Sequence, residues 1–142
     1  MDKIITCFLP YSTEKNTKNT VTGLRTCSAI GDIIVIHTNK QEVVLPEGCK
    51  SLVAGSLQQT QTLKALAGEI HTAYTLLYTQ SLPLQLGAYA IERLLQVADD
   101  TQSGLLYTDC YKIKNGVQQA HPVIDYQEGS LRDDFDFGSL LL

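Results

Sequence analysis

Two short segments dominated by β-branched residues constrain the fold of this chain most strongly. Lys3–Leu9 reads KIITCFL and Asp32–His37 reads DIIVIH, and both are nearly continuous apolar runs. Such runs are typical of strands that are buried on both faces of a sheet. Between them, apolar residues at helical spacing predict a helix over roughly residues 16–29, closed by Gly31 just past its end. This alternation predicts an α/β fold, a three-layer sandwich around a mostly parallel sheet.

The rest of the chain continues the alternation of strands and helices and then forms a hairpin. Ser56 is a suitable N-cap for the helix that follows it, and Pro83 opens an amphipathic helix that ends at Asp99–Asp100. Asn115-Gly116 is the dipeptide preferred in type I′ turns, which predicts a β-hairpin over Tyr111–His121. The remaining expected strands are Ser51–Ala54, His71–Thr79 and Gly104–Thr108.

The charge and cysteine patterns exclude several classes of protein. Eleven basic and fifteen acidic residues give a formal net charge of -4, without the basic cluster that binds duplex nucleic acid. The four cysteines are scattered, with no CxxC or Cys/His cluster for structural zinc or a redox pair. The apolar runs are far shorter than the ~20 residues of a membrane span, and the N-terminus lacks a signal-peptide pattern. We therefore expect a cytoplasmic protein with reduced thiols, in which Cys7 is a small buried apolar residue.

Residues that follow the strands are candidate ligand contacts, because open α/β sheets bind ligands outside the carboxyl ends of their strands. Neither GxGxxG nor GxxxxGK[ST] follows the first strand, which argues against Rossmann-type dinucleotide binding and P-loop chemistry. His37 has two interpretations: a ligand contact at a strand end, or a packed or surface histidine. The expected strand ends supply six candidate residues: Pro10, Tyr11, His37, Asn39, Thr79 and Gln80.

Two groups of acidic residues are candidates for metal binding. Asp109 directly follows an apolar strand, where its carboxylate would face the ligand crevice, although an aspartate that shapes a turn gives the same pattern. Asp134 and Asp136 form a DxD, whose carboxylates point to the same side of an extended chain. Paired carboxylates suit Mg²⁺ or Mn²⁺ on a diphosphate, and a solvated acidic loop beside Arg132 is the alternative interpretation.

Several segments together resemble one enzyme family. The opening KIITCFLPYSTEKNT, the later DIIVIHTN and the stretch SLQQTQTLKALAGEIHTAYTLLYTQSLPLQLGAYAIERLLQVA follow the layout of that family. More specific is LLYTDCYKIKNG…HPVIDYQEGSLRDDFDFG, in which a tyrosine-aspartate strand end precedes a hairpin and a GSxRDDFDFG stretch. Through these segments, which span essentially the whole chain, the sequence resembles family 2 glycosyltransferases of the GT-A fold, in particular a Bacteroidetes-type subgroup.

The resemblance implies transfer of a sugar from a nucleotide-diphosphate donor to an acceptor hydroxyl in cell-surface glycan or polysaccharide synthesis. It implies that Pro10, Tyr11 and Ser12 cradle the nucleotide and that Mg²⁺ or Mn²⁺ neutralises the diphosphate. The family commonly has an acidic residue after the second strand, where this chain has His37-Thr38-Asn39. The family's DxD position is Thr79-Gln80-Ser81 here, without a carboxylate, and neutral side chains hold Mg²⁺ weakly. Asp109 is therefore the metal-binding candidate.

The resemblance also bears on domain organisation and partners. We expect residues 1–142 to form a single domain, the N-terminal nucleotide-sugar-binding part of a longer glycosyltransferase. The catalytic base of such enzymes usually lies in the second half of the domain, so we expect it beyond Leu142 and expect this chain alone to be inactive. Further expectations are a homodimer through an apolar surface, peripheral membrane association of the full-length protein, and no nucleic-acid partner.

Two other functions compete with glycosyl transfer. A catalytically silent GT-A-like module for binding or assembly is favoured by the missing acids at Thr79–Ser81. An active enzyme should bind a nucleotide diphosphate more tightly with Mn²⁺, whereas a silent module should not respond to the ion. A nucleotidyltransferase would need a glycine-rich basic loop after the first strand, and Pro10–Thr20 contains lysines but no glycine.

Overall fold

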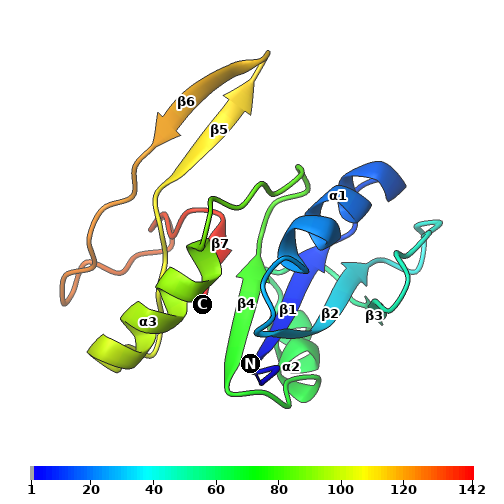
Figure 1. The fold of residues 1–142 in the computed structure, drawn as a ribbon, viewed down its shortest axis with the longest axis horizontal. Helices are drawn as coiled ribbons and strands as arrows, with labels where there is room; N and C mark the ends of the chain where they lie inside the picture. The colour runs from blue at the N-terminus through cyan, green and yellow to red at the C-terminus, as the bar shows by residue number, and fades with distance from the viewer. Residues whose placement is uncertain (1) are drawn as a thin grey trace.

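The computed structural model describes residues 2–142 and has an α/β fold with one five-stranded sheet and a separate hairpin (Figure 1). The strands are β1 (Ile5–Pro10), β2 (Ile30–His37), β3 (Lys50–Val53), β4 (Tyr74–Tyr78), β5 (Cys110–Lys114), β6 (Val117–His121) and β7 (Leu140–Leu141). The helices are α1 (Glu14–Leu24), α2 (Thr60–Gly68) and α3 (Ala90–Thr101).

The main sheet is mostly parallel, as the alternation of strands and helices predicts. Its strands lie in the order β3-β2-β1-β4-β7, and only β7 runs antiparallel to its neighbour β4. In the central strand, Phe8 is aligned with Ile34 of β2 on one side and with Leu77 of β4 on the other. The most apolar segment of the sequence is therefore at the centre of the sheet, where hydrogen bonds and packing cover it from every side.

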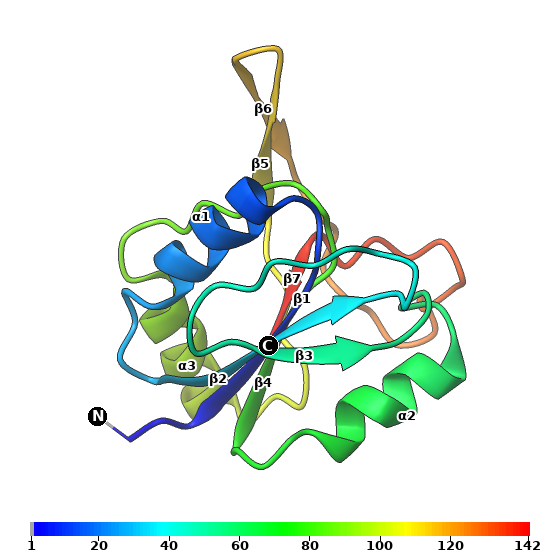
Figure 2. The ribbon, with the colours of Figure 1, turned by 90° about the vertical axis from the view of Figure 1, so that its right-hand side faces the viewer.

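Helices cover both faces of the sheet, which confirms the predicted three-layer sandwich. Ile5, Cys7 and Leu9 of β1 belong to the larger buried cluster, which contains residues of α1 and α3. Phe8 points to the other face, where it belongs to a smaller cluster with Leu66 of α2. Figure 2 shows α1 and α3 on one side of the sheet and α2 on the opposite side. Both clusters form because successive side chains of a strand point to opposite faces.

The first helix is shorter than predicted. It begins at Glu14, capped by the Thr13 side chain, which accepts a hydrogen bond from Asn16 N, and it ends at Leu24. Gly31 does not close this helix; it lies inside β2. A Cβ atom at Gly31 would lie 3.3 Å from the carbonyl oxygen of Ile5, so the missing side chain lets the two strands approach closely.

The other two helices begin later than predicted. Ser56 Oγ accepts a hydrogen bond from Gln58 N within a turn, and α2 begins only at Thr60. Pro83 likewise does not open α3, because the chain from Pro83 to Tyr89 is irregular. Leu84 N in this segment donates to the buried Thr20 Oγ1 at 3.0 Å, which ties the segment to α1. Tertiary contacts thus replace the first helical turns that the sequence pattern suggests.

The expected strand Gly104–Thr108 is not part of the regular sheet. Only Tyr107 forms an isolated bridge, with Leu141, while Leu106 and Leu142 exchange backbone hydrogen bonds of 2.8 and 3.0 Å. The place next to β4 is taken by β7, whose Leu140 is buried and belongs to the larger core cluster. Leu140 and Leu141 thus form a strand, and Leu142 packs against the same core cluster.

The predicted hairpin is present and forms a sheet of its own. Strands β5 and β6 pair antiparallel, and Asn115 and Gly116 have φ angles of 52° and 76°, as a type I′ turn requires. The hairpin projects beyond the rest of the molecule (Figures 1 and 2). Within residues 2–142, no helix has the length and apolar character needed to cross a membrane.

Candidate functional site

The chain reverses its direction across the sheet between β1 and β4, and this reversal defines the candidate site. From β1 the chain passes through α1 to β2 on one side, whereas from β3 it returns through α2 to β4 on the other side of β1. The connections that follow β1 and precede β4 therefore cover opposite faces of the sheet. In open α/β sheets such a reversal opens a crevice beyond the carboxyl ends of the two strands, where ligands bind.

Pro10 and Tyr11 lie at the carboxyl end of β1, as predicted. Pro10 is aligned with Ile36 of β2, and Tyr11 N donates a hydrogen bond of 2.7 Å to the Ile36 carbonyl oxygen. The Tyr11 hydroxyl accepts a hydrogen bond from Val44 N at 3.4 Å, so the half-buried ring spans the space between β1 and the loop after β2. The ring therefore extends from the end of β1 toward the side of β2, and it packs against the larger core cluster.

His37 and Asn39 lie at the carboxyl end of β2, one strand away from the reversal. The His37 carbonyl oxygen accepts a hydrogen bond from Ala54 N after β3, and its ring Nδ1 lies 3.0 Å from the Thr38 carbonyl oxygen. Asn39 is exposed in the following turn, which Gln41 closes by accepting a hydrogen bond from Thr38 N at 2.9 Å. The imidazole is half-buried at this edge, so a ligand at the edge could contact it.

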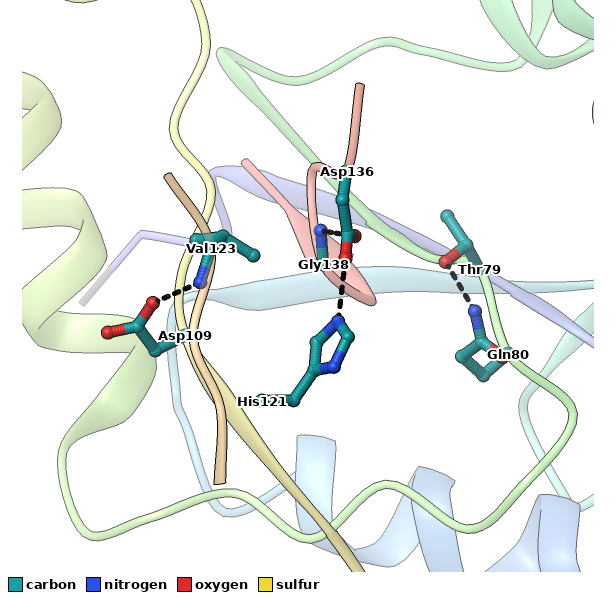
Figure 3. Close-up of polar contacts among 7 residues, drawn as sticks. All are labelled: Thr79, Gln80, Asp109, His121, Val123, Asp136 and Gly138. Carbon is teal, nitrogen blue, oxygen red and sulfur yellow. Dashed lines mark hydrogen bonds and ion pairs between the residues drawn. The ribbon is translucent and has the colours of Figure 1, made fainter. Parts of the chain in front are cut away.

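Thr79 and Gln80 follow β4 directly and connect the candidate site to the C-terminal segment. Both the backbone nitrogen and the hydroxyl of Thr79 donate to the Ser139 carbonyl oxygen, at 3.0 and 3.3 Å. The Gln80 side-chain amide donates to Thr79 Oγ1 at 3.4 Å (Figure 3). Thr79 therefore anchors the start of β7, while the exposed Gln80 amide keeps further hydrogen-bonding capacity for a ligand.

Asp109 lies at the base of the hairpin, where it holds the two chain segments together. Its Oδ1 accepts a hydrogen bond of 2.7 Å from Val123 N, so residues just before β5 and just after β6 are linked (Figure 3). This contact joins residues 14 positions apart, so it is not the local turn or cap of the alternative interpretation. One carboxylate oxygen remains for other contacts, and metal binding at Asp109 stays a prediction. Residues 2–142 contain no group of three or more His, Cys, Asp or Glu that could hold a metal ion.

The two carboxylates of the DxD pattern make separate contacts. Asp134 Oδ1 lies 3.4 Å from Arg132 Nε, an exposed ion pair of the kind expected for a solvated acidic loop. Asp136 Oδ2 instead lies 2.7 Å from His121 Nε2, and its Oδ1 accepts a hydrogen bond from Gly138 N at 2.8 Å (Figure 3). The two side chains therefore stabilise different parts of the C-terminal segment.

The contact between His121 and Asp136 could not be predicted from the sequence. The hydrogen bond from the Gly138 backbone is the main cause that lowers the pKa of Asp136, and burial acts against it. The hydrogen bond and charge of His121 and the charge of Lys112 lower this pKa further. The carboxylate is therefore ionised over the physiological pH range. The two residues are 15 positions apart in the sequence, and the segment between them folds back on the end of β6 to bring the side chains together.

An aromatic cluster supports the C-terminal segment on the other side. The Tyr107 ring makes edge contacts with Phe135 and Phe137 at centroid distances of 5.9 and 5.4 Å, and its hydroxyl donates to the Ile124 carbonyl oxygen. Phe135 also contacts Tyr126. This cluster was not predicted from the sequence. The spacing of Phe135 and Phe137 is the signal that could have indicated it, because it places both rings on one side of an extended chain.

Two hollows lie away from the predicted ligand contacts. One of about 610 Å³ lies between α1 and the segment Pro83–Glu92. The other, of about 450 Å³, lies within the C-terminal segment, between Pro122–Ile124 and Gly129–Asp136. None of the six predicted ligand contacts lines either hollow. The predicted residues instead share one edge of the sheet, with Tyr11 and Gln80 flanking the reversal between β1 and β4.

In comparisons with known proteins, no protein-family model and no curated protein sequence matches this chain.

Proposed function

We propose that this chain is the nucleotide-sugar-binding part of a glycosyltransferase that transfers a sugar from a nucleotide-diphosphate donor to an acceptor hydroxyl in cell-surface glycan or polysaccharide synthesis. The observation that carries the proposal is the reversal of chain direction between β1 and β4. It gives the sheet a ligand edge that is formed by Tyr11 on one strand and by Thr79 and Gln80 on the next. The sequence resemblance to family 2 glycosyltransferases supplies the reaction.

In this proposal Tyr11, Gln80 and Asp109 have separate tasks. The Tyr11 ring provides a flat apolar surface for the base of the nucleotide. The Gln80 amide donates hydrogen bonds to phosphate oxygens, whose negative charge favours such donors. Asp109 contributes its free carboxylate oxygen to a Mg²⁺ or Mn²⁺ ion on the diphosphate, and the ion stabilises the negative charge of the leaving group.

A catalytically silent module for binding or assembly is the second candidate, and two observations favour it. The position after β4 holds only neutral side chains at Thr79–Ser81. The Asp109 and Asp136 carboxylates are already hydrogen-bonded within the protein. A module of this kind would keep the fold and the hairpin but would not bind a metal–nucleotide complex.

A thermal-shift titration with UDP, GDP and CMP, each with and without Mn²⁺, tests the proposal. A bound nucleotide raises the melting temperature by mass action, so even a modest affinity is measurable. We expect a Mn²⁺-dependent rise with one of the nucleoside diphosphates. The Gln80→Ala variant should weaken binding several-fold, whereas Gln61→Ala, on the exposed surface of α2, should leave it unchanged. No shift with any nucleotide would overturn the proposal and favour the silent module.

A further inference from the structure

The irregular segment between β4 and α3 passes beside α1 and forms a hollow with it (Figure 2). The hydrogen bond from Leu84 N to the buried Thr20 Oγ1 holds the segment against this helix. The hollow has a volume of about 610 Å³, which is typical of sites that bind small organic molecules. None of the proposed nucleotide contacts lines it, so it is a separate place on the molecule.

Much of the lining is apolar. Leu84 and Leu86 of the irregular segment line the hollow, and both are half-buried and pack against the larger core cluster. Ile91 of α3 also lines it and is 1% exposed. Because such a surface gains little from contact with water, the hollow favours a ligand with an apolar body.

Glu92, in the first turn of α3, is the one charged residue among those that line the hollow. It is half-buried, and no lysine, arginine or histidine among residues 2–142 forms an ion pair with it. The α3 N-terminus carries a partial positive charge of about half an elementary charge, which offsets only part of the carboxylate's charge. The hollow therefore has a net negative charge and favours a cation.

The Glu92 carboxylate lies close to the buried Cys27 thiol, which lines the hollow from the side of α1. Burial is the main cause that raises the pKa of the Cys27 thiol, and the hydrogen bond and charge of Glu92 raise it further. Backbone hydrogen bonds of Ala29 and Ile30 act against this rise. The carboxylate is therefore directed across the hollow toward α1, and a ligand between the two helices would meet it.

Tyr89 lies at the mouth of the hollow in a strained backbone conformation. Its φ and ψ angles are 57° and 24°, in the left-handed region, whereas the residue before a helix usually has an extended backbone. Its side chain does not cap α3, and the residue is 79% exposed. Bulky residues rarely adopt this conformation, and strain of this kind is concentrated at ligand-binding sites. An exposed aromatic ring also attracts organic cations.

We propose that this hollow binds a small organic cation, an amine that carries an apolar body. The ammonium group pairs with the Glu92 carboxylate, and the Tyr89 ring covers it from the mouth. The apolar body lies against Leu84 and Leu86. On the side of α1, the amide oxygen of the exposed Asn19 accepts a further hydrogen bond from the ammonium group. This site is independent of the proposed nucleotide-sugar function.

An NMR titration of the isotope-labelled chain with phenethylamine tests the proposal. Neutral phenethyl alcohol and anionic phenylacetate are matched probes of similar size. We expect saturable shifts of the backbone amide signals of residues 83–92, with a Kd of about 1 mM or lower for the amine. The alcohol and the carboxylate should bind about tenfold more weakly or not at all. The absence of a saturable shift with the amine would overturn the proposal, as would equal binding of the three probes.

Two substitutions test the assigned residues, and circular dichroism melts establish that each variant keeps the fold. Glu92→Gln keeps the size of the side chain but removes its charge, so it should raise the Kd of the amine by about tenfold. Glu69→Gln removes an exposed carboxylate just after α2 and should leave this Kd unchanged. Unchanged binding in the Glu92→Gln variant would overturn the proposal.

The Tyr89→Gly variant separates a binding role of this residue from a structural one. Glycine adopts the left-handed backbone without strain, so the melting temperature should stay the same or rise. Amine binding should nevertheless weaken several-fold, because the aromatic ring is lost. A lower melting temperature together with unchanged amine binding would overturn the place of Tyr89 in the site. Binding of a lysine-rich peptide without binding of the amine would overturn the proposal and assign the hollow to a protein partner.

Discussion

His121 Nε2 lies 2.7 Å from Asp136 Oδ2, and this contact joins the last residue of the hairpin to the segment that leads into β7. The same carboxylate accepts a hydrogen bond from Gly138 N. One ionised side chain therefore links the base of the hairpin to the C-terminal segment. The next residue, Ser139, accepts hydrogen bonds from Thr79 at the end of β4. These links place the C-terminal segment against the candidate ligand edge.

The lowered pKa of Asp136 makes part of the stability depend on pH. Because the folded-state pKa is below the ordinary value, the stabilisation is fully present above about pH 4 and is lost as the pH falls through the folded-state pKa. The Asp136→Asn variant should remove this acid-labile part, so its melting temperature should fall less steeply on acidification. Melting curves between neutral and acidic pH measure the difference. Asp2→Asn, near the exposed N-terminus, is the control and should behave like the unaltered protein.

Gly138 occupies a backbone position that only glycine fits. Its φ angle is +71°, and a Cβ atom there would lie 2.8 Å from the Thr108 carbonyl oxygen. Gly138→Ala should therefore destabilise the fold by about 1–3 kcal/mol, because it adds strain and forces two backbone segments apart. Urea denaturation measures the loss.

Gly68→Ala is the matched control for this substitution. Gly68 is the last residue of α2, and a Cβ atom there would meet nothing within 4 Å. Alanine reduces the conformational freedom of the unfolded chain and favours the helix, so the variant should be neutral or gain up to about 1 kcal/mol. Equal effects of the two substitutions would contradict the strain that we assign to Gly138.

The parts of the fold that the sequence predicts correctly are those controlled by local pattern. Continuous β-branched runs identify β1 and β2, and Asn115-Gly116 identifies the hairpin turn, because these signals act within a few residues. The prediction of a strand at Gly104–Thr108 is wrong for the opposite reason. Its apolar residues suit a strand, but the place beside β4 is filled by Leu140 and Leu141, which lie more than thirty residues away.

The candidate site also contains residues whose position the sequence predicts and a contact that it does not predict. The places of Pro10, Tyr11, Thr79 and Gln80 at strand ends are predicted correctly, because the pattern that identifies a strand also fixes where it ends. Their contact with a ligand stays a prediction. The contact between His121 and Asp136 is not found, because it depends on how the hairpin is placed relative to the C-terminal segment. Side-chain partners of this kind are decided by tertiary structure, and no spacing in the sequence encodes them.

Burial should make Cys7 the least reactive of the four thiols. Burial in the sheet raises its pKa to about 12, with a further contribution from the nearby Cys27, so almost no thiolate forms at pH 8. Alkylation with iodoacetamide under native conditions should therefore modify the half-buried Cys49 and Cys110 first and leave Cys7 intact. Mass spectrometry of the digested protein measures the order. Modification of Cys7 at the rate of Cys110 would show that β1 is exposed in solution.

The Asp109→Asn substitution separates the structural task of this residue from its proposed metal binding. Asparagine keeps a carbonyl oxygen that can accept the hydrogen bond from Val123 N, so the base of the hairpin should keep its structure and the melting temperature should change little. The substitution removes the negative charge that a divalent ion needs. If Asp109 binds the ion, the Mn²⁺-dependent part of the nucleotide-induced thermal shift should disappear, while binding without the ion should persist. A full Mn²⁺ response in this variant would assign the ion to another carboxylate. The Asp134→Asn variant would then be the next to measure, because Asp134 is exposed and makes only a surface ion pair with Arg132 within the described residues.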